Sequence, residues 1–199
     1  LSSGKWKDSV TGNYANVYTN EYGQLTKVSK KHYVEGNDGL VNKFDYLEGN
    51  KHTRIDFPIT VNNNNWTVAY VTRYNPHGGA DVDGRILQGR TNWLLGHWHH
   101  RAGVCHQNGW VGHHDRNKIP EQRSWILGIE QPRKFMRRSA KRDWNISTGG
   151  GNVGSDKLYI NSGGHRNETA DFHIAELIVY NRKLDASEID KLKTYMVNK

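Results

Sequence analysis

Short apolar segments, each ended by a turn rich in Gly or Asn, follow one another along most of this 199-residue chain and restrict its fold more than any other feature. In residues 53–61, apolar side chains stand at every second position, which is the period of a strand with one buried face. Residues 66–74 follow a run of four asparagines as a second strand. Residues 172–181 are apolar on both faces, as in a central strand. This succession predicts an antiparallel β protein.

Further segments extend the pattern, and one helix closes the chain. Asn108-Gly109 lies between two apolar pieces and predicts a hairpin. Asp185, with Glu188 three residues later, predicts a helix that starts with a capping box and continues with an apolar stripe. We therefore predict an all-β, antiparallel two-sheet β-sandwich with a short C-terminal helix. The other expected strands are residues 85–89, 92–98, 124–130 and 157–161, and the stripe is Ile189, Leu192, Tyr195 and Met196.

The composition indicates a folded chain whose core depends on aromatic residues. Mean hydropathy is −0.87, and Leu, Ile, Val and Phe together number 41 of 199 residues, which is near the lower limit for a folded chain. The 7 Trp, 10 Tyr and 4 Phe compensate, because each ring buries a large area. The single Cys105 excludes an intrachain disulfide, and no apolar run approaches the ~18 residues of a membrane span. The first ten residues show no signal peptide and no Met, so we expect a fragment or a processed product.

Positive charge is concentrated in one part of the chain. The net charge is +8, and residues 116–142 hold nine Lys or Arg against Glu121 and Glu130. The centre of this basic run is residues 133–142. Such a run attracts polyanions, namely acidic glycans, nucleic acid or a membrane surface. The alternative is a solvated loop whose charges only keep the protein soluble.

The closing segment, residues 171–196, resembles the last strand and helix of laminin-G-like, concanavalin A-like jelly-roll domains. In those domains an Ala-Glu pair on a central strand leads to Tyr-Asn-Arg-x-Leu and a Ser-x-x-Glu helix start. The segments VTRYN, GRILQG, NWLLGHW and NGWV, and residues 158–176, are similar to a branch common in large algal viruses and in algae. The resemblance implies a single jelly-roll domain over residues 34–199, preceded by an extension or first strands in residues 1–33. It also implies a role in glycan binding, adhesion or virion structure, mostly without catalysis.

Six of the eleven histidines lie in residues 92–115 and raise the question of a metal site. If residues 97–100 continue a strand, His97 and His99 point to the same face and could share a zinc ion. A third ligand would come from His106, His113, His114 or Asp115. The alternative, which we favour, is a scaffold segment whose imidazoles make it sensitive to pH.

A calcium site is a second metal candidate, at Asp81 and Asp83. Calcium needs six to eight oxygen ligands, so two carboxylates favour the alternative of a solvated Gly turn. We therefore predict no cofactor, with calcium or zinc as the metals to test.

Candidate catalytic groups are few. Sandwich glycosidases of this superfamily carry Glu-x-Asp-x-x-Glu on one strand, and the nearest match, Glu188-x-Asp190, lies on the predicted helix without the second Glu. Glu176 is isolated on an apolar strand, where we expect a satisfied structural residue. Cys105 precedes a His that would point to the opposite face of a strand, so we expect a buried, inert thiol. We predict no enzymatic activity.

The tryptophans divide into two groups. Trp66, Trp93 and Trp125 lie within predicted strands and are expected in the core. Trp98, Trp110 and Trp144 lie near loops, where exposed rings could stack on sugar faces, although burial in the core is the favoured expectation for each.

Together these features predict a non-catalytic, lectin-like binding module on a virion or a cell surface. The preferred ligand would be an acidic or sulfated glycan. One alternative is a structural minor capsid or assembly protein whose sandwich contacts other capsid or surface proteins. Another is a sequence-blind, salt-dependent contact with nucleic acid, since Phe135 is the only aromatic residue in the basic run and sequence-specific recognition needs more. The predicted glycan-binding residues are Arg133, Lys134, Arg137, Arg138, Lys141, Arg142, Trp98 and Trp110.

Overall fold

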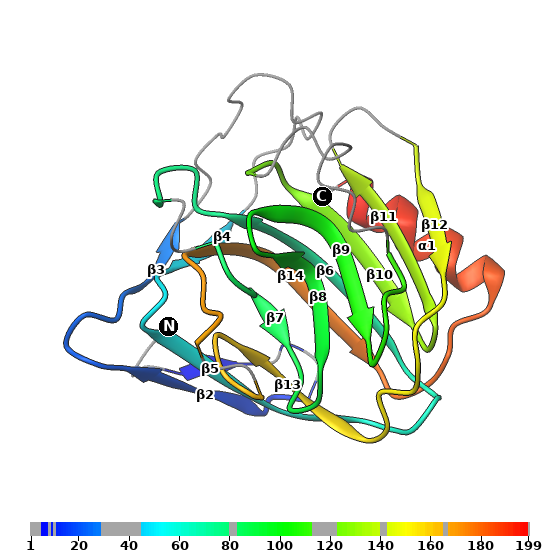
Figure 1. Ribbon diagram of the computed structural model, residues 1–199, viewed down its shortest axis with the longest axis horizontal. Coiled ribbons are helices and arrows are strands. Elements are labelled where there is room, and N and C mark those ends of the chain that lie inside the picture. Colours follow the sequence, from blue (N-terminus) through cyan, green and yellow to red (C-terminus); the bar gives the residue numbers. More distant parts are fainter. Residues whose placement is uncertain are drawn as a thin grey trace.

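The structure is a computed structural model that describes residues 5–7, 9, 11–28, 45–79, 83–112, 123–139, 143–164 and 167–198. Within these residues the chain forms fourteen strands and one helix, arranged as two stacked antiparallel sheets (Figure 1). The predicted two-sheet β-sandwich with a C-terminal helix is therefore confirmed. Within the described part of the chain, no helix has the length and the apolar character needed to cross a lipid bilayer.

The first sheet, called sheet A here, has the strand order β1-β2-β5-β13-β7-β8-β9. Strand β2 pairs with β5, so residues near the N-terminus are part of this sheet. Sheet A contains β1 (Lys5–Lys7), β2 (Tyr14–Thr19), β5 (Thr53–Val61), β13 (Asp156–Ile160), β7 (Leu87–Gln88), β8 (Trp93–Trp98) and β9 (Arg101–Gln107).

The second sheet, sheet B, has the order β12-β11-β10-β6-β14-β4-β3. The apolar strand β14 lies between β6 and β4, so its predicted central position is confirmed. Sheet B contains β12 (Asn145–Thr148), β11 (Lys134–Ser139), β10 (Ile126–Gln131), β6 (Thr67–Tyr74), β14 (Phe172–Tyr180), β4 (Tyr46–Gly49) and β3 (Leu25–Val28).

The main core lies between the two sheets. Alternation in β5 buries Ile55, Phe57 and Val61 there, as the sequence pattern predicts. Trp66 and Trp93 are also buried in this core, with ring centroids 4.9 Å apart. Their predicted core positions are confirmed, and the large rings supply the buried area that the few aliphatic residues do not.

A second core lies on the outer face of sheet B, beneath helix α1 (Ala186–Val197). The Asp185 side chain accepts a hydrogen bond from the Glu188 amide, and the Glu188 side chain accepts one from the Asp185 amide, so the capping box is confirmed. Trp125 is buried in this second core, which confirms its predicted burial.

One residue of the predicted helical stripe is placed differently. Ile189, Leu192 and Met196 are buried, but Tyr195 is 48% exposed. Its hydroxyl donates to Glu176 Oε2 at 2.9 Å. Tyr195 therefore lies at the margin of the helix contact, where its hydroxyl can remain in contact with water. Glu176, which accepts this hydrogen bond, is the satisfied structural residue that we expected.

Candidate functional site

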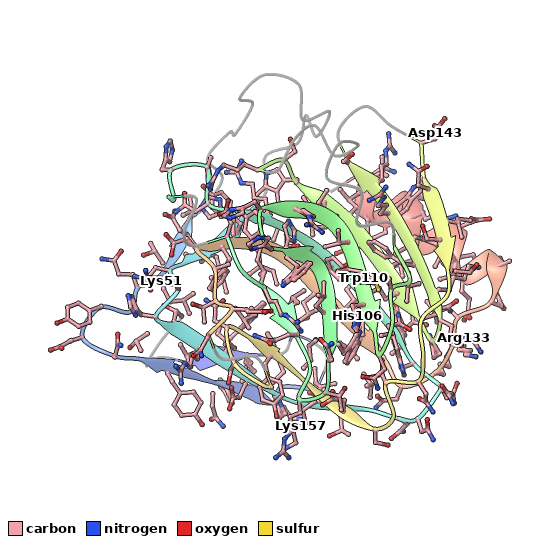
Figure 2. The ribbon with its side chains drawn as sticks, viewed as in Figure 1. Lys51, His106, Trp110, Arg133, Asp143 and Lys157 are labelled. Atoms are coloured by element: carbon pink, nitrogen blue, oxygen red, sulfur yellow. The ribbon has the colours of Figure 1, made fainter. Side chains whose placement is uncertain are left out.

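A cluster of aromatic side chains lies on the outer face of sheet A, and we call it the aromatic platform: Trp98, His99, His106 and Trp110. Neighbouring residues set this orientation, because His97, Cys105 and Gln107 point into the sandwich and alternation turns Trp98 and His106 outward. The Trp98 and Trp110 ring centroids are 5.3 Å apart, with an angle of 49° between the rings. Both indoles are partly buried, and Figure 2 shows the labelled Trp110 and His106 near the middle of the molecule.

Two different parts of the chain build the platform. Trp98 ends β8, whereas Trp110 follows the Asn108-Gly109 turn after β9. The predicted hairpin forms only in part, because its second arm is reduced to an isolated bridge between His106 and Trp110. That bridge holds the Trp110 ring against His106, with centroids 5.0 Å apart.

A carboxylate and two guanidinium groups flank the platform. Trp98 Nε1 donates to Glu168 Oε2 at 3.1 Å, and Arg85 Nε donates to the same oxygen at 2.5 Å. The Arg85 side chain is buried, and this burial lowers its pKa against the opposing effect of Glu168. The Glu168 side chain is 38% exposed, so it remains open to a ligand. On the other side, Arg101 Cζ lies 5.1 Å from the Trp98 ring centroid.

This arrangement combines groups that recognise polar ligands with apolar faces. Indole faces can pack against the apolar C–H face of a ligand ring, while a carboxylate accepts hydrogen bonds from the hydroxyls of a ligand. The structure brings together the predicted pair Trp98 and Trp110 and adds Glu168, Arg85 and Arg101, which the sequence analysis missed. No spacing signal could have identified Glu168, because it lies 70 residues from its partner Trp98.

His97 and His99, the pair that we considered as zinc ligands against the favoured scaffold interpretation, do not converge. Strand β8 ends at Trp98, and His99 and His100 have φ of 47° and 63°, which makes them a left-handed turn. His97 instead lies in the core, with Nδ1 3.4 Å from the Thr72 hydroxyl, and burial lowers its pKa to about 3.

The described residues contain no group of three or more His, Cys, Asp or Glu that could hold a metal ion. The candidate ligands His113, His114 and Asp115 lie outside the described residues, as does Asp81. The described part of the chain therefore provides no evidence for either a zinc or a calcium site.

Asp83 is buried and ion-paired, so the expectation of a solvated turn is wrong at this residue. Its Oδ2 lies 2.9 Å from Arg123 Nη2 and 3.5 Å from His100 Nδ1. Burial raises the pKa of Asp83, and the Arg123 charge acts in the opposite direction. Asp83 thus connects the turn after β8 to the Arg123 segment.

The basic run is a strand over residues 134–139, and the expectation of a loop there is wrong. Phe135 and Met136 are buried on opposite faces of sheet B, which hides the strand period from the sequence. Arg137 points into the sandwich and donates to the Gly103 carbonyl. Lys134 and Arg138 share the outer face with Met136, and Arg133 lies in the turn before β11 with φ of 62°.

The structure therefore separates the predicted basic residues from the predicted tryptophans. Lys134 and Arg138 lie on the outer face of sheet B, whereas Trp98 and Trp110 lie on the outer face of sheet A. Lys141 and Arg142 lie outside the described residues.

A buried polar network around Glu130 is the second feature that the sequence analysis missed. Glu130 is fully buried between the sheets and accepts hydrogen bonds from Tyr70 Oη at 2.8 Å and Trp93 Nε1 at 3.2 Å. Burial raises the pKa of Glu130 to about 7 despite these donors. Cys105 is buried beside the network, which confirms its expected burial, and the same desolvation raises its thiol pKa.

Comparisons with known proteins give limited similarity. No protein-family model matches the sequence, and no curated protein matches it. Domain 4 of AbnA, a GH43 extracellular arabinanase from Geobacillus stearothermophilus in complex with arabinotriose, is 13% identical with a TM-score of 0.47. That similarity covers 85% of this chain and 87% of the other. A Trypanosoma rangeli sialidase in complex with the inhibitor DANA is 12% identical with a TM-score of 0.36, over 88% of this chain and 33% of the sialidase. At these levels neither structure identifies a function.

Proposed function

We propose that this protein is a non-catalytic carbohydrate-binding module whose site is the aromatic platform. The observation that carries the proposal is the pairing of two partly buried indoles, Trp98 and Trp110, at 5.3 Å on the outer face of one sheet. Such rings present flat apolar surface at low entropic cost, since each has only two side-chain torsions.

The surroundings of the platform suit a sugar. Each pyranose or furanose ring combines an apolar face with hydroxyls at its rim. The indoles would stack on that face, and the Glu168 carboxylate beside Trp98 would accept hydrogen bonds from hydroxyls. Arg85 holds Glu168 in place before any ligand arrives, which reduces the ordering cost of binding.

The finer identity of the glycan is part of the proposal. The net charge of +8 would favour an acidic or sulfated sugar, because it would steer such a ligand to the protein. The basic strand β11 is on the other sheet, so we assign it no direct contact with this ligand. A site of this kind suits a virion or cell surface, which is the setting we propose.

A glycan array holding neutral and sulfated saccharides, read at low and high salt, tests the proposal. We expect selective binding that Trp98→Ala and Trp110→Ala each weaken by about five- to thirtyfold, because one stacked ring contributes roughly 1–2 kcal/mol. Trp144→Ala is the matched control, because Trp144 is also half-buried but packs at the second core, near Lys193.

The array distinguishes the outcomes. Salt-sensitive binding to sulfated sugars supports a preference for acidic ligands. Salt-resistant binding to a neutral sugar would show instead that stacking on the indoles alone supplies the affinity. Equal losses in the Trp98 and Trp144 variants, or no binding to any saccharide, would overturn the carbohydrate proposal.

A further inference from the structure

Within the described part of the chain, strand β12 forms an open edge of sheet B. It pairs with β11 from Lys134↔Thr148 to Arg137↔Asn145, and it is the last strand in the order of the sheet (Figure 1). Among the described residues, no other backbone group bonds to residues 145–148. A free edge of this kind presents a row of N–H and C=O groups that another extended chain can pair with.

The other sheet edges carry features that discourage pairing. Strand β1 has the sequence Lys-Trp-Lys, and β3 contains Lys27, which is paired with Asp45. The edge of β9 is partly covered, because Val111 and Gly112 donate to the Cys105 carbonyl and Gly151 donates to the Gln107 carbonyl. Strand β12, Asn-Ile-Ser-Thr, has neither a charge nor a Pro, and its Ile146 is 57% exposed.

Positive charge lies beside this edge. Ile146 is opposite Met136, so it shares the outer face of sheet B with Lys134 and Arg138 on the neighbouring strand. In the described part of the chain, no carboxylate forms an ion pair with Arg133, Lys134 or Arg138. Figure 2 shows Arg133 and Asp143 at opposite ends of the β11–β12 pair.

We propose that β12 is a docking edge for an extended acidic segment of another protein, which adds to sheet B as an eighth strand. Main-chain hydrogen bonds to β12 would supply affinity, while side chains on one face of the added strand would meet Ile146 and the cations of β11. The charge selects the partner. Two copies of this chain pairing through β12 would bring their Arg133, Lys134 and Arg138 close together, and like charges oppose that contact.

Calorimetric titration with a blocked peptide of alternating glutamate and valine tests this proposal. We expect binding, and we expect Arg138→Glu and Lys134→Glu each to weaken it by about fivefold. Lys157→Glu is the matched control, because Lys157 is exposed on β13 in the other sheet, and its effect should stay below about twofold.

Two changes to the peptide separate strand pairing from simple charge attraction without altering the protein. Methylation of alternate backbone nitrogens removes hydrogen-bond donors but keeps the charge, and it should abolish binding. A peptide of alternating lysine and valine should not bind. Hydrogen exchange with the acidic peptide should show new protection at the amides of residues 145–148.

The contrary results are equally distinct. Equal binding of the methylated peptide would reduce the contact to electrostatics and overturn the docking edge. Absence of binding, or protection elsewhere without protection at 145–148, would overturn it as well. None of these results depends on whether the aromatic platform binds a glycan.

Discussion

At the scale of single residues, burial of ionisable groups decides how this protein responds to pH. Glu130 is enclosed between the sheets and satisfied by Tyr70, Trp93 and Gln107. The charged form of Glu130 is still disfavoured, because these donors do not replace the water that the carboxylate loses on burial. His97 and His173 are disfavoured as cations for the same reason, and burial lowers the pKa of each to about 3.

Glu130 makes the fold weaker at higher pH. Its pKa is raised from 4.5 to about 7, so the stability that it contributes is complete below pH 4.5 and is lost as pH rises through 7. Replacement by Gln removes the titration. From pH 4.5 to 8, the free energy of unfolding of Glu130→Gln should rise relative to wild type by up to about 3 kcal/mol. Urea denaturation across this range measures the difference, and a constant difference contradicts the prediction.

The two histidines act in the opposite direction. Their pKa in the fold is below the usual 6.5, so the stability that they contribute is present above pH 6.5 and is lost as pH falls toward 3. We expect unfolding near pH 5 to take up about one proton per histidine. The pH dependence of the urea midpoint gives the number of protons taken up on unfolding, and this number should decrease by about one in His97→Asn. An unchanged slope would show that His97 already titrates normally in the fold.

At the scale of elements, local hydrogen bonds determine where α1 begins. The Asp185–Glu188 capping box satisfies two amides that the helix itself leaves unpaired, and Arg182 binds the same Glu188 carboxylate at 2.5 and 2.7 Å. Because α1 covers the second core, fraying of its first turn exposes Leu184 and Ile189.

Removal of the cap should therefore destabilise the whole domain. We expect Asp185→Ala to lower the free energy of unfolding by about 1 kcal/mol. Asp190→Ala is the control on the same helix, because the Asp190 side chain is 74% exposed and its 3.3 Å pair with Lys193 should contribute less than about 0.5 kcal/mol. Thermal and urea denaturation of both variants compare the two effects. Equal losses would mean that the cap does not determine the start of the helix.

At the scale of the whole molecule, the sandwich places two candidate binding surfaces on different sheets. The aromatic platform lies on the outer face of sheet A, and the docking edge is the outermost strand of sheet B. The two surfaces meet at one margin, because Gly151, just after β12, donates to the Gln107 carbonyl, and Asn108 Nδ2, in the turn before Trp110, donates to the Asn152 carbonyl. Trp98 and Arg138 lie away from this margin and share no described partner, so we expect substitutions at these two residues to act without coupling.

Independence of the two surfaces is a measurable prediction. In the double variant Trp98→Ala/Arg138→Glu, the loss of glycan binding should equal that of Trp98→Ala alone, and the loss of peptide binding should equal that of Arg138→Glu alone. Distant sites without shared partners add within about 0.5 kcal/mol. Titration of each ligand, with and without saturation by the other, gives the coupling. A larger difference would indicate that the core transmits a change between the sheets.

The sequence by itself determined the elements whose signals are local. The alternation in residues 53–61 predicted β5, and Asp185 with Glu188 predicted the start of α1. Trp66, Trp93 and Trp125 were placed in the core because apolar residues within strands have few other positions. Each of these features depends only on residues that are close in sequence, so periodicity and capping patterns are enough to predict it.

Only the tertiary structure decided the candidate sites. Trp98 meets Glu168 across 70 residues of sequence, and His97 and His99 separate because β8 ends one residue earlier than a continued strand would require. The basic run forms a strand because Phe135 and Met136 each find a core on opposite faces of sheet B. Pairing between distant segments depends on which faces meet after folding, and no local pattern of residues encodes that meeting.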